Sequence, residues 1–173
     1  DQVAFNRGSA PYYNAQLVEI PTQDYAFLLI SHYLFTMADK LRLAALSQSS
    51  FAPLAELARK LAREEKYHQL HAQTWVQQLA TSTEEAKNKM QNALNGAYPL
   101  AFSLFEPTEY SDILASEGVQ IHEKELETQW QTMVEAFFTQ IGLSIPDTSN
   151  RTDYFGGRKG IHTEHLQPLL LEM

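Results

Sequence analysis

The sequence predicts an all-α protein whose long helices pack into a bundle. Long segments carry apolar residues at every third or fourth position, which is the pattern of an amphipathic helix. The seven glycines and seven prolines lie mainly between these segments, where they mark helix ends and turns. No stretch alternates apolar and polar residues as a strand does, and no internal repeat is evident. Helices of this length usually bury their apolar faces against one another.

The helix starts are predicted from local signals. Residues 1–20 look irregular, and Pro21 precedes the first amphipathic segment. Pro53 lies in the first turn of the second segment, where proline is well tolerated. The sequence "STEE" has the pattern of a capping box, with Ser82 facing Glu85, and it predicts the start of a third helix.

The helix ends are predicted in the same way. Pro99 should bend or end the third helix, because proline lacks a backbone N–H. Gly118 and Gly142 should each end a helix, since glycine readily adopts the left-handed conformation found there. The expected helices cover residues 22–48, 52–80, 82 to between 98 and 105, 108–117, 122–142 and a last one from 162, with a polar loop over 143–161.

Composition limits the possible functions. With 173 residues, 44% of them hydrophobic and 20% charged, we expect one domain over residues 1–173. The net charge of −8 argues against nucleic acids and anionic membranes as partners. The absence of cysteine excludes disulfides and thiolate metal sites, and it fits a cytoplasmic location. No apolar run is long enough to span a membrane. Asp1 and the apolar run that ends at Met173 suggest that both ends are trimmed.

The segment "REEKYHQLHA" contains Glu65 and His68, a Glu-x-x-His pair that helical bundles use to hold iron or manganese. Both residues belong to a row with helical spacing that we expect to face the core, so they should point inward together. That row consists of Leu54, Ala58, Leu61, Glu65, His68, Ala72, Trp75 and Leu79.

A buried carboxylate and imidazole need a partner, which is either a metal or other polar groups. A di-metal site requires two Glu-x-x-His pairs and two further carboxylates, whereas this sequence has one such pair. In the first helix, His32, Thr36 and Asp39 share a face and are expected to oppose Glu65 and His68. We therefore interpret the five residues as a polar core, with Glu65, His68 and Asp39 as vestigial metal-ligand candidates.

The segment "FGGRKGIHTEH" is the second unusual stretch. Backbone amides and a helix N-terminus favour anions, so Arg158 and Lys159 are candidates for contact with a phosphate or with a partner's carboxylates. His162 and His165 follow and belong to the same candidate contact region. The alternative interpretation is a glycine turn followed by a helix cap, with the cations in water.

These two stretches together carry a resemblance to a known family. "REEKYHQLHAQTWVQQL" and "GGRKGIHTEHLQPLLLEM" resemble the C subunits of the ring 1,2-phenylacetyl-CoA epoxidase of phenylacetate degradation. "AFNRGSAPYYNAQLVEIPTQDYA" and "YLFTMADKL" are similar to the middle region of the same family. The resemblance implies a ferritin-like helical bundle, with further helices expected before Asp1.

The resemblance also implies a role. The C subunit is a structural companion that clasps a homologous catalytic A subunit, and the A subunit holds the di-iron site and the acyl-CoA. No catalytic residue and no cofactor are then expected in this chain, and the partners are the A subunit and the other epoxidase subunits. The sequence departs from the family pattern at Glu65, where a small apolar residue is usual, and at Thr36, where a catalytic relative has a carboxylate.

Two alternatives remain open at this point. The chain is an oxidase or oxygenase in its own right if carboxylates upstream of Asp1 complete a metal site around Glu65 and His68. It is a homo-oligomeric binding module for an acyl-CoA or similar anion if Arg158 and Lys159 are free to bind one.

Overall fold

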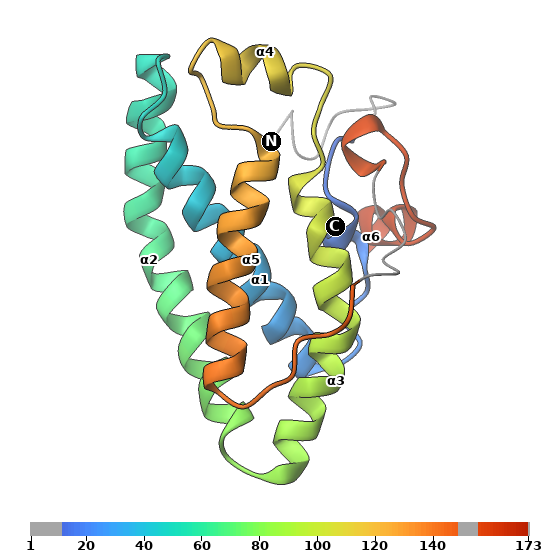
Figure 1. The fold of residues 1–173 in the computed structure, drawn as a ribbon. Coiled ribbons are helices and arrows are strands. Elements are labelled where there is room, and N and C mark those ends of the chain that lie inside the picture. Colours follow the sequence, from blue (N-terminus) through green and yellow to red (C-terminus); the bar gives the residue numbers. More distant parts are fainter. Residues whose placement is uncertain (1–11, 149–155, 173) are drawn as a thin grey trace.

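The computed structural model describes residues 12–148 and 156–172, and both ranges are built from helices and their connections (Figure 1). No strand occurs within these ranges, so the prediction of an all-α, ferritin-like helical bundle is confirmed. The α-helices are α1 (Tyr25–Leu46), α2 (Ala52–Ala80), α3 (Glu84–Ala101), α4 (Ser111–Ser116), α5 (Glu123–Gln140) and α6 (Leu166–Glu172). Three short 3₁₀ turns are η1 (Gln16–Glu19), η2 (Phe102–Phe105) and η3 (Gly157–Lys159).

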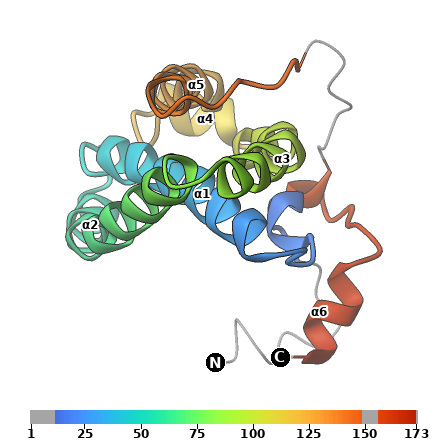
Figure 2. The ribbon, with the colours of Figure 1, turned by 90° about the horizontal axis from the view of Figure 1, so that it is seen from below.

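Helix α1 runs through the middle of the bundle. It packs against α2 on one side and against α3 and α5 on the other, as the view along the bundle shows (Figure 2). The short helix α4 lies across one end, and the C-terminal segment flanks the side formed by α3 and η1 (Figure 1). This central place explains why α1 buries apolar residues over most of its circumference, including Ile30 and Leu34.

Aromatic rings fill the core between α1, α3 and α5. The Trp130 side chain is fully buried and stacks on Tyr98, with ring centroids 5.6 Å apart. Phe102 and Phe105 contact the same indole from η2. The indole nitrogen of Trp130 donates a hydrogen bond to the Leu34 carbonyl at 3.0 Å, so its polar atom is satisfied.

The start signals of two helices differ from the prediction. Helix α1 begins at Tyr25 because the Asp24 carboxylate accepts a hydrogen bond from the Phe27 amide at 2.7 Å. The expected cap at Ser82 is wrong, since the Ser82 hydroxyl donates backwards to the Leu79 carbonyl. Thr83 caps α3 instead, and its hydroxyl accepts a hydrogen bond from the Ala86 amide.

The predicted helix ends agree well with the structure. Pro99 lies inside α3, which ends at Ala101 and tightens into η2. Gly118 and Gly142 have positive φ angles of 69° and 78° just beyond α4 and α5. The last helix begins at Leu166 and not near residue 162, because residues 162 and 163 contact the bundle. Part of the predicted polar loop, residues 149–155, lies outside the described residues.

The buried face of α2 coincides with the row that the sequence indicated only at Ala58 and Ala72. Its buried residues are small, namely Ala55, Ala58, Ala72, Val76 and Ala80. Small side chains let α2 approach α1 closely, because the distance between helices follows the side chains at the contact. Three larger members of the predicted row, Leu61, His68 and Trp75, are exposed. None of the described helices is long and apolar enough to cross a membrane.

Candidate functional site

The structure brings five of the predicted residues together along the contact between α1 and α2. His32, Thr36 and Asp39 lie on α1, and Glu65 and His68 lie on α2; we call this group the polar strip. The His32 and His68 rings meet edge to face, with centroids 6.2 Å apart. Thr36 is buried, while His32, Asp39 and Glu65 are half-buried. His68 is exposed, so the expectation that all five residues form a buried core is wrong for His68.

The polar strip is an unfavourable environment for charged side chains. Burial raises the pKa of Glu65, His68 lowers it, and nearby Asp39 raises it further. Burial also raises the pKa of Asp39, against the attraction of Arg42 and Arg158. The pKa of His32 is lowered by burial and by repulsion from His68 and His71. No ion pair within the described ranges includes Asp39 or Glu65.

Thr36 carries an unsatisfied polar atom. The residue is 1% exposed, and its Oγ1 has no hydrogen-bond partner among the described residues. The hydroxyl lies near enough to Glu65 to lower the pKa of that carboxyl, but without the geometry of an ordinary hydrogen bond. A buried hydroxyl without a partner costs free energy.

We therefore predict that Thr36→Val stabilises the chain. Valine has nearly the same shape and removes the unsatisfied hydroxyl, so the free energy of unfolding should rise by about 1 kcal/mol. Urea unfolding followed by circular dichroism measures the change. Thr132→Val is the matched control, because the Thr132 hydroxyl already donates to the Thr128 carbonyl on an exposed helix face. A loss of stability in Thr36→Val would contradict this interpretation.

The polar strip does not fit a di-iron centre. In the part of the chain that the structure describes, no three His, Asp or Glu side chains converge closely enough to hold a metal ion. A carboxylate-bridged pair of metals needs six such ligands, of which a single Glu-x-x-His supplies two. Glu65, His68 and Asp39 therefore share a neighbourhood without forming a ligand set.

A second group of charged residues fastens the C-terminal segment to the bundle. Glu123, at the start of α5, is buried and accepts two hydrogen bonds from Arg42, at 2.6 and 2.9 Å. Arg158 donates to the same carboxylate at 3.2 Å. Both guanidinium groups also donate to the Leu104 carbonyl at 2.8 Å. The two cations thus share one buried anion between α1, α5 and η3.

Two further buried carboxylates bind the same segment through its backbone. Glu106 accepts hydrogen bonds from the amides of Gly156 and Arg158, at 2.8 and 3.2 Å. Glu19 lies 2.7 Å from His162 Nδ1 and accepts hydrogen bonds from the amide and the hydroxyl of Thr163, both at 2.7 Å. We call Glu19, Glu106 and Glu123, with the residues they bind in 156–163, the C-terminal anchor.

Two of the predicted contact residues, Arg158 and His162, are part of the C-terminal anchor. Arg158 and His162 are largely covered, whereas the Lys159 side chain is 61% exposed and pairs only at 3.9 Å with Glu106. His165 is half-buried. Arg158 therefore serves the fold, and the alternative of an anion site formed jointly by Arg158 and Lys159 loses one of its two cations.

The glycines of "FGGRKG" are required by close packing. A Cβ atom on Gly157 would overlap the carbonyl oxygen of Asn14. Gly156 has a φ of 134°, which side chains rarely allow. The segment can therefore lie directly against the N-terminal turn only because both positions lack a side chain.

Glu19 gives the anchor a dependence on pH. Burial alone would raise the pKa of Glu19, but hydrogen bonds from His162, Thr163 and Asn14 outweigh burial and lower it. The charged form is thus favoured in the folded state, so its stabilising contribution is complete above the usual pKa of 4.5 and disappears as the pH falls below that value.

We predict that Glu19→Gln destabilises the chain at pH 7 and that this difference shrinks as the pH falls and the natural carboxyl becomes protonated. Urea midpoints of both proteins, measured at several pH values, test the prediction. Glu164→Gln is a control on the same segment. Parallel midpoint curves for Glu19→Gln and the natural chain would contradict it.

Sequence reasoning missed the three carboxylates of the anchor. Two of them interrupt apolar runs, as in "LVEIP" around Glu19 and "AFSLFEP" around Glu106. A lone acidic residue within such a run is a usable signal, because a buried charge needs a partner. The sequence did not reveal the partner of Glu19, because His162 is 143 residues away from it.

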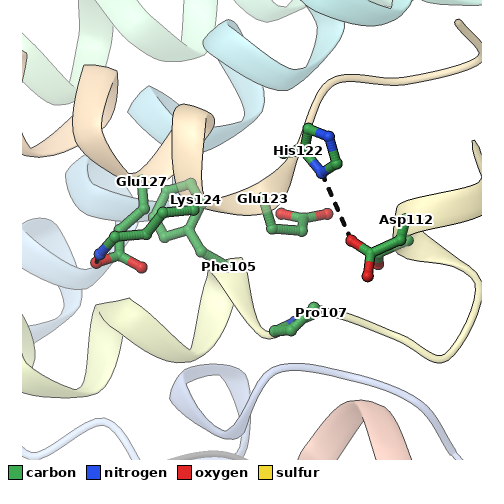
Figure 3. Close-up of a pocket in the computed structure, with 8 residues that line it drawn as sticks. Phe105, Pro107, Asp112, His122, Glu123, Lys124 and Glu127 are labelled. Carbon is green, nitrogen blue, oxygen red and sulfur yellow. Dashed lines mark hydrogen bonds and ion pairs between the residues drawn. The ribbon is translucent and has the colours of Figure 1, made fainter. Parts of the chain in front are cut away.

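Two clefts lie beside the anchor. The smaller, of about 340 Å³, is bordered by Phe105, Pro107 and the start of α5 (Figure 3). There Lys124 pairs with Glu127 at 2.8 Å, and His122 lies 3.6 Å from Asp112. The larger, of about 1040 Å³, is lined by Tyr13, Pro107, Thr108, Glu109, Tyr110, Asp112, Arg158 and Lys159. Both clefts are open and have mixed charges, so neither indicates a particular ligand.

Fold and site together define a ferritin-like helical-bundle protein in which buried carboxylates hold the chain's own segments. Comparison with known proteins identifies the family. The chain belongs to the phenylacetic acid catabolic protein family, whose sequence model matches residues 1–173. It is 31% identical over 174 residues to the C subunit of the 1,2-phenylacetyl-CoA epoxidase of Escherichia coli (strain K12), an alignment that covers 100% of this chain and 69% of that protein. The resemblance inferred from the sequence motifs is confirmed.

Proposed function

We propose that this chain is the non-catalytic, structural subunit of a multicomponent di-iron monooxygenase that epoxidises the aromatic ring of phenylacetyl-CoA. In this role it clasps and stabilises a homologous catalytic A subunit, which holds the iron and the acyl-CoA, and it works in the cytoplasm with the other epoxidase subunits. The observation that carries the proposal is the similarity to the C subunit of such an epoxidase along the whole chain.

The use of the buried carboxylates supports a structural role. Glu19, Glu106 and Glu123 are each 6% exposed or less, and all three bind cations or backbone amides of this chain. Carboxylates engaged in this way stabilise the fold and are not available as ligands. In the described part of the chain Glu65 forms no ion pair, and His68 of the same Glu-x-x-His motif lies beside it.

The test is assembly with the catalytic subunit. The chain and the A subunit from the same organism are expressed together, and the complex is analysed by size-exclusion chromatography with light scattering. We expect a stable complex, and we expect epoxidation of phenylacetyl-CoA only when both subunits and a separate reductase that supplies the electrons are present. Separate elution of the two subunits would overturn the proposal.

Metal analysis distinguishes this proposal from an enzyme that works alone. The full natural chain is produced in cells supplied with iron and manganese, and it is purified with and without the A subunit. We expect iron only in samples that contain the A subunit. About two metal ions per chain in the isolated protein would instead indicate a complete site of its own.

A further inference from the structure

The His162 ring has an oxygen atom at hydrogen-bonding distance from each of its two nitrogens. Its Nδ1 lies 2.7 Å from Oε1 of Glu19, and its Nε2 lies 2.8 Å from the backbone carbonyl oxygen of Tyr12. The His162 side chain is only 16% exposed, so water has little access to replace either contact. Neither contact is repulsive only if both ring nitrogens carry a hydrogen atom.

Neither of the two oxygen atoms can supply that hydrogen. A backbone carbonyl only accepts hydrogen bonds, and so does an ionised carboxylate. Glu19 also accepts hydrogen bonds from Asn14 Nδ2 at 2.8 Å and from the amide and the hydroxyl of Thr163, both at 2.7 Å. Burial would raise the pKa of Glu19, but its hydrogen bonds outweigh burial and lower the pKa, so the ionised form is favoured. Both donors must therefore belong to the ring, and only the imidazolium form of histidine has two N–H groups.

The charged surroundings of the ring also favour the imidazolium form. The charged group that contacts it is Glu19 of η1, whereas the turn before η1 faces the ring with a backbone carbonyl. On its own segment, Lys159, Glu164 and His165 lie within three residues of His162. The Lys159 ammonium lies 3.9 Å from Glu106 and is 61% exposed to water. The closest charge is thus the negative one.

The other half of the C-terminal anchor does not depend on a histidine proton. Glu106 accepts hydrogen bonds from the amides of Gly156 and Arg158, and Glu123 pairs with the Arg158 guanidinium. Amides and guanidinium groups keep their protons far above neutral pH. Gly160 lies between the two halves with a φ of 80°, and glycine adopts other backbone conformations at little cost. The chain after Gly160 can therefore move while the half before it stays bound.

We propose that His162 is a proton-dependent latch, which as an imidazolium holds residues 161–172 to the N-terminal turn and releases them when it loses one ring proton. In the neutral ring, one nitrogen presents a lone pair to an oxygen atom at 2.7 or 2.8 Å, so one of the two hydrogen bonds becomes repulsive. Residues 156–158 stay bound to Glu106 and Glu123. The inference does not depend on the proposed function.

The direction of the pH dependence follows from counting protons. A histidine in the released segment loses its proton near pH 6.5, whereas His162 in the closed anchor keeps it to higher pH. The closed state therefore binds one proton more over this interval, and opening becomes up to about tenfold more favourable for each pH unit. This dependence has the opposite sign to that of Glu19, which weakens the anchor in acid.

Nuclear magnetic resonance of the ring nitrogens tests the protonation state directly. The full natural chain is isotopically labelled at histidine, and the ring of His162 is assigned through its connection to the backbone. At about pH 7.5, where a free histidine is mostly neutral, we expect a proton on both ring nitrogens of His162. In Glu19→Gln we expect a proton on one nitrogen only, because the glutamine amide can donate to a neutral ring. A single protonated nitrogen in the natural chain would overturn the inference.

Amide hydrogen exchange shows whether the latch opens. The Thr163 amide donates to Glu19 and the Arg158 amide to Glu106, so the ratio of their protection factors compares the two halves of the anchor at each pH. Above about pH 6.5 we expect Thr163 to lose up to about tenfold in protection relative to Arg158 for each pH unit. The ratio should stay constant in His162→Gln. His165→Gln is the matched control from the same segment and should behave like the natural chain.

Two results of the exchange measurement would also overturn the inference. One is a constant ratio in the natural chain, which would mean that both halves of the anchor open together or not at all. The other is the same slope in His162→Gln, which would assign the dependence to another group. The ring measurement on the natural chain stands even if a variant fails to fold. Assembly with the A subunit is measured separately by chromatography, so failure here leaves the proposed function standing.

Discussion

Replacing Glu123 with glutamine is expected to lower the free energy of unfolding by about 3 kcal/mol. Both Arg42 and Arg158 bind the Glu123 carboxylate, which is only 6% exposed. Glutamine keeps the shape but not the charge, so two partly buried guanidinium groups would lie close together without an anion between them. Removing one member of a buried ion pair is costly because the remaining charge stays desolvated.

Urea unfolding measures the global effect, and hydrogen–deuterium exchange locates it. The amides of residues 156–163 should lose protection first, because Arg158 belongs to this segment and loses its ionic partner. Glu125→Gln is the control, since Glu125 lies two residues further along α5 and is exposed; its effect should stay within about 0.5 kcal/mol. Equal stabilities for Glu123→Gln and Glu125→Gln would show that the anchor contributes little.

Replacing Trp130 with alanine is expected to destabilise the chain by about 3–5 kcal/mol. The indole is the hub of the aromatic core, contacting Tyr98, Phe102 and Phe105. Its removal leaves a cavity between α3, α5 and η2, and it leaves the Leu34 carbonyl without the hydrogen bond that the indole donates. Rigid neighbours on three sides make collapse into the cavity difficult.

The chain's second tryptophan is the matched control. Trp75 is 40% exposed on α2, so Trp75→Ala should change the free energy of unfolding by less than about 1 kcal/mol. Urea unfolding of both variants, followed by circular dichroism, gives the comparison. If Trp75→Ala destabilised the chain as much as Trp130→Ala, the exposed side of α2 would have to contribute to the stability of residues 1–173 themselves.

The fold class and most helix limits could be predicted from the residues alone. Helix α2 was predicted over 52–80 and is observed over Ala52–Ala80, because local signals such as Pro53 lie within the helix they start. The glycines that end helices could be recognised from the sequence because each lies next to the helix that it ends. The gathering of His32, Thr36 and Asp39 opposite Glu65 and His68 also followed from helical spacing.

The buried face of α2, in contrast, is set by how the helices pack. Periodicity shows that a helix has an apolar row, but it does not distinguish a row that packs on the core from one that is exposed. Leucine and tryptophan dominate the exposed row, whereas alanines form the buried one. Close approach of two helices favours small residues, and hydrophobicity patterns give alanine little weight.

The C-terminal anchor also depended on tertiary structure. Glu19 and His162 are 143 residues apart, and Arg42 and Glu123 are 81 residues apart. No local pattern specifies such pairs, because a buried charge reveals only that it needs a partner. For Arg158 and Lys159 the sequence left two interpretations open, an anion contact or cations in water. In the structure Arg158 binds the distant Glu123 and is part of the fold.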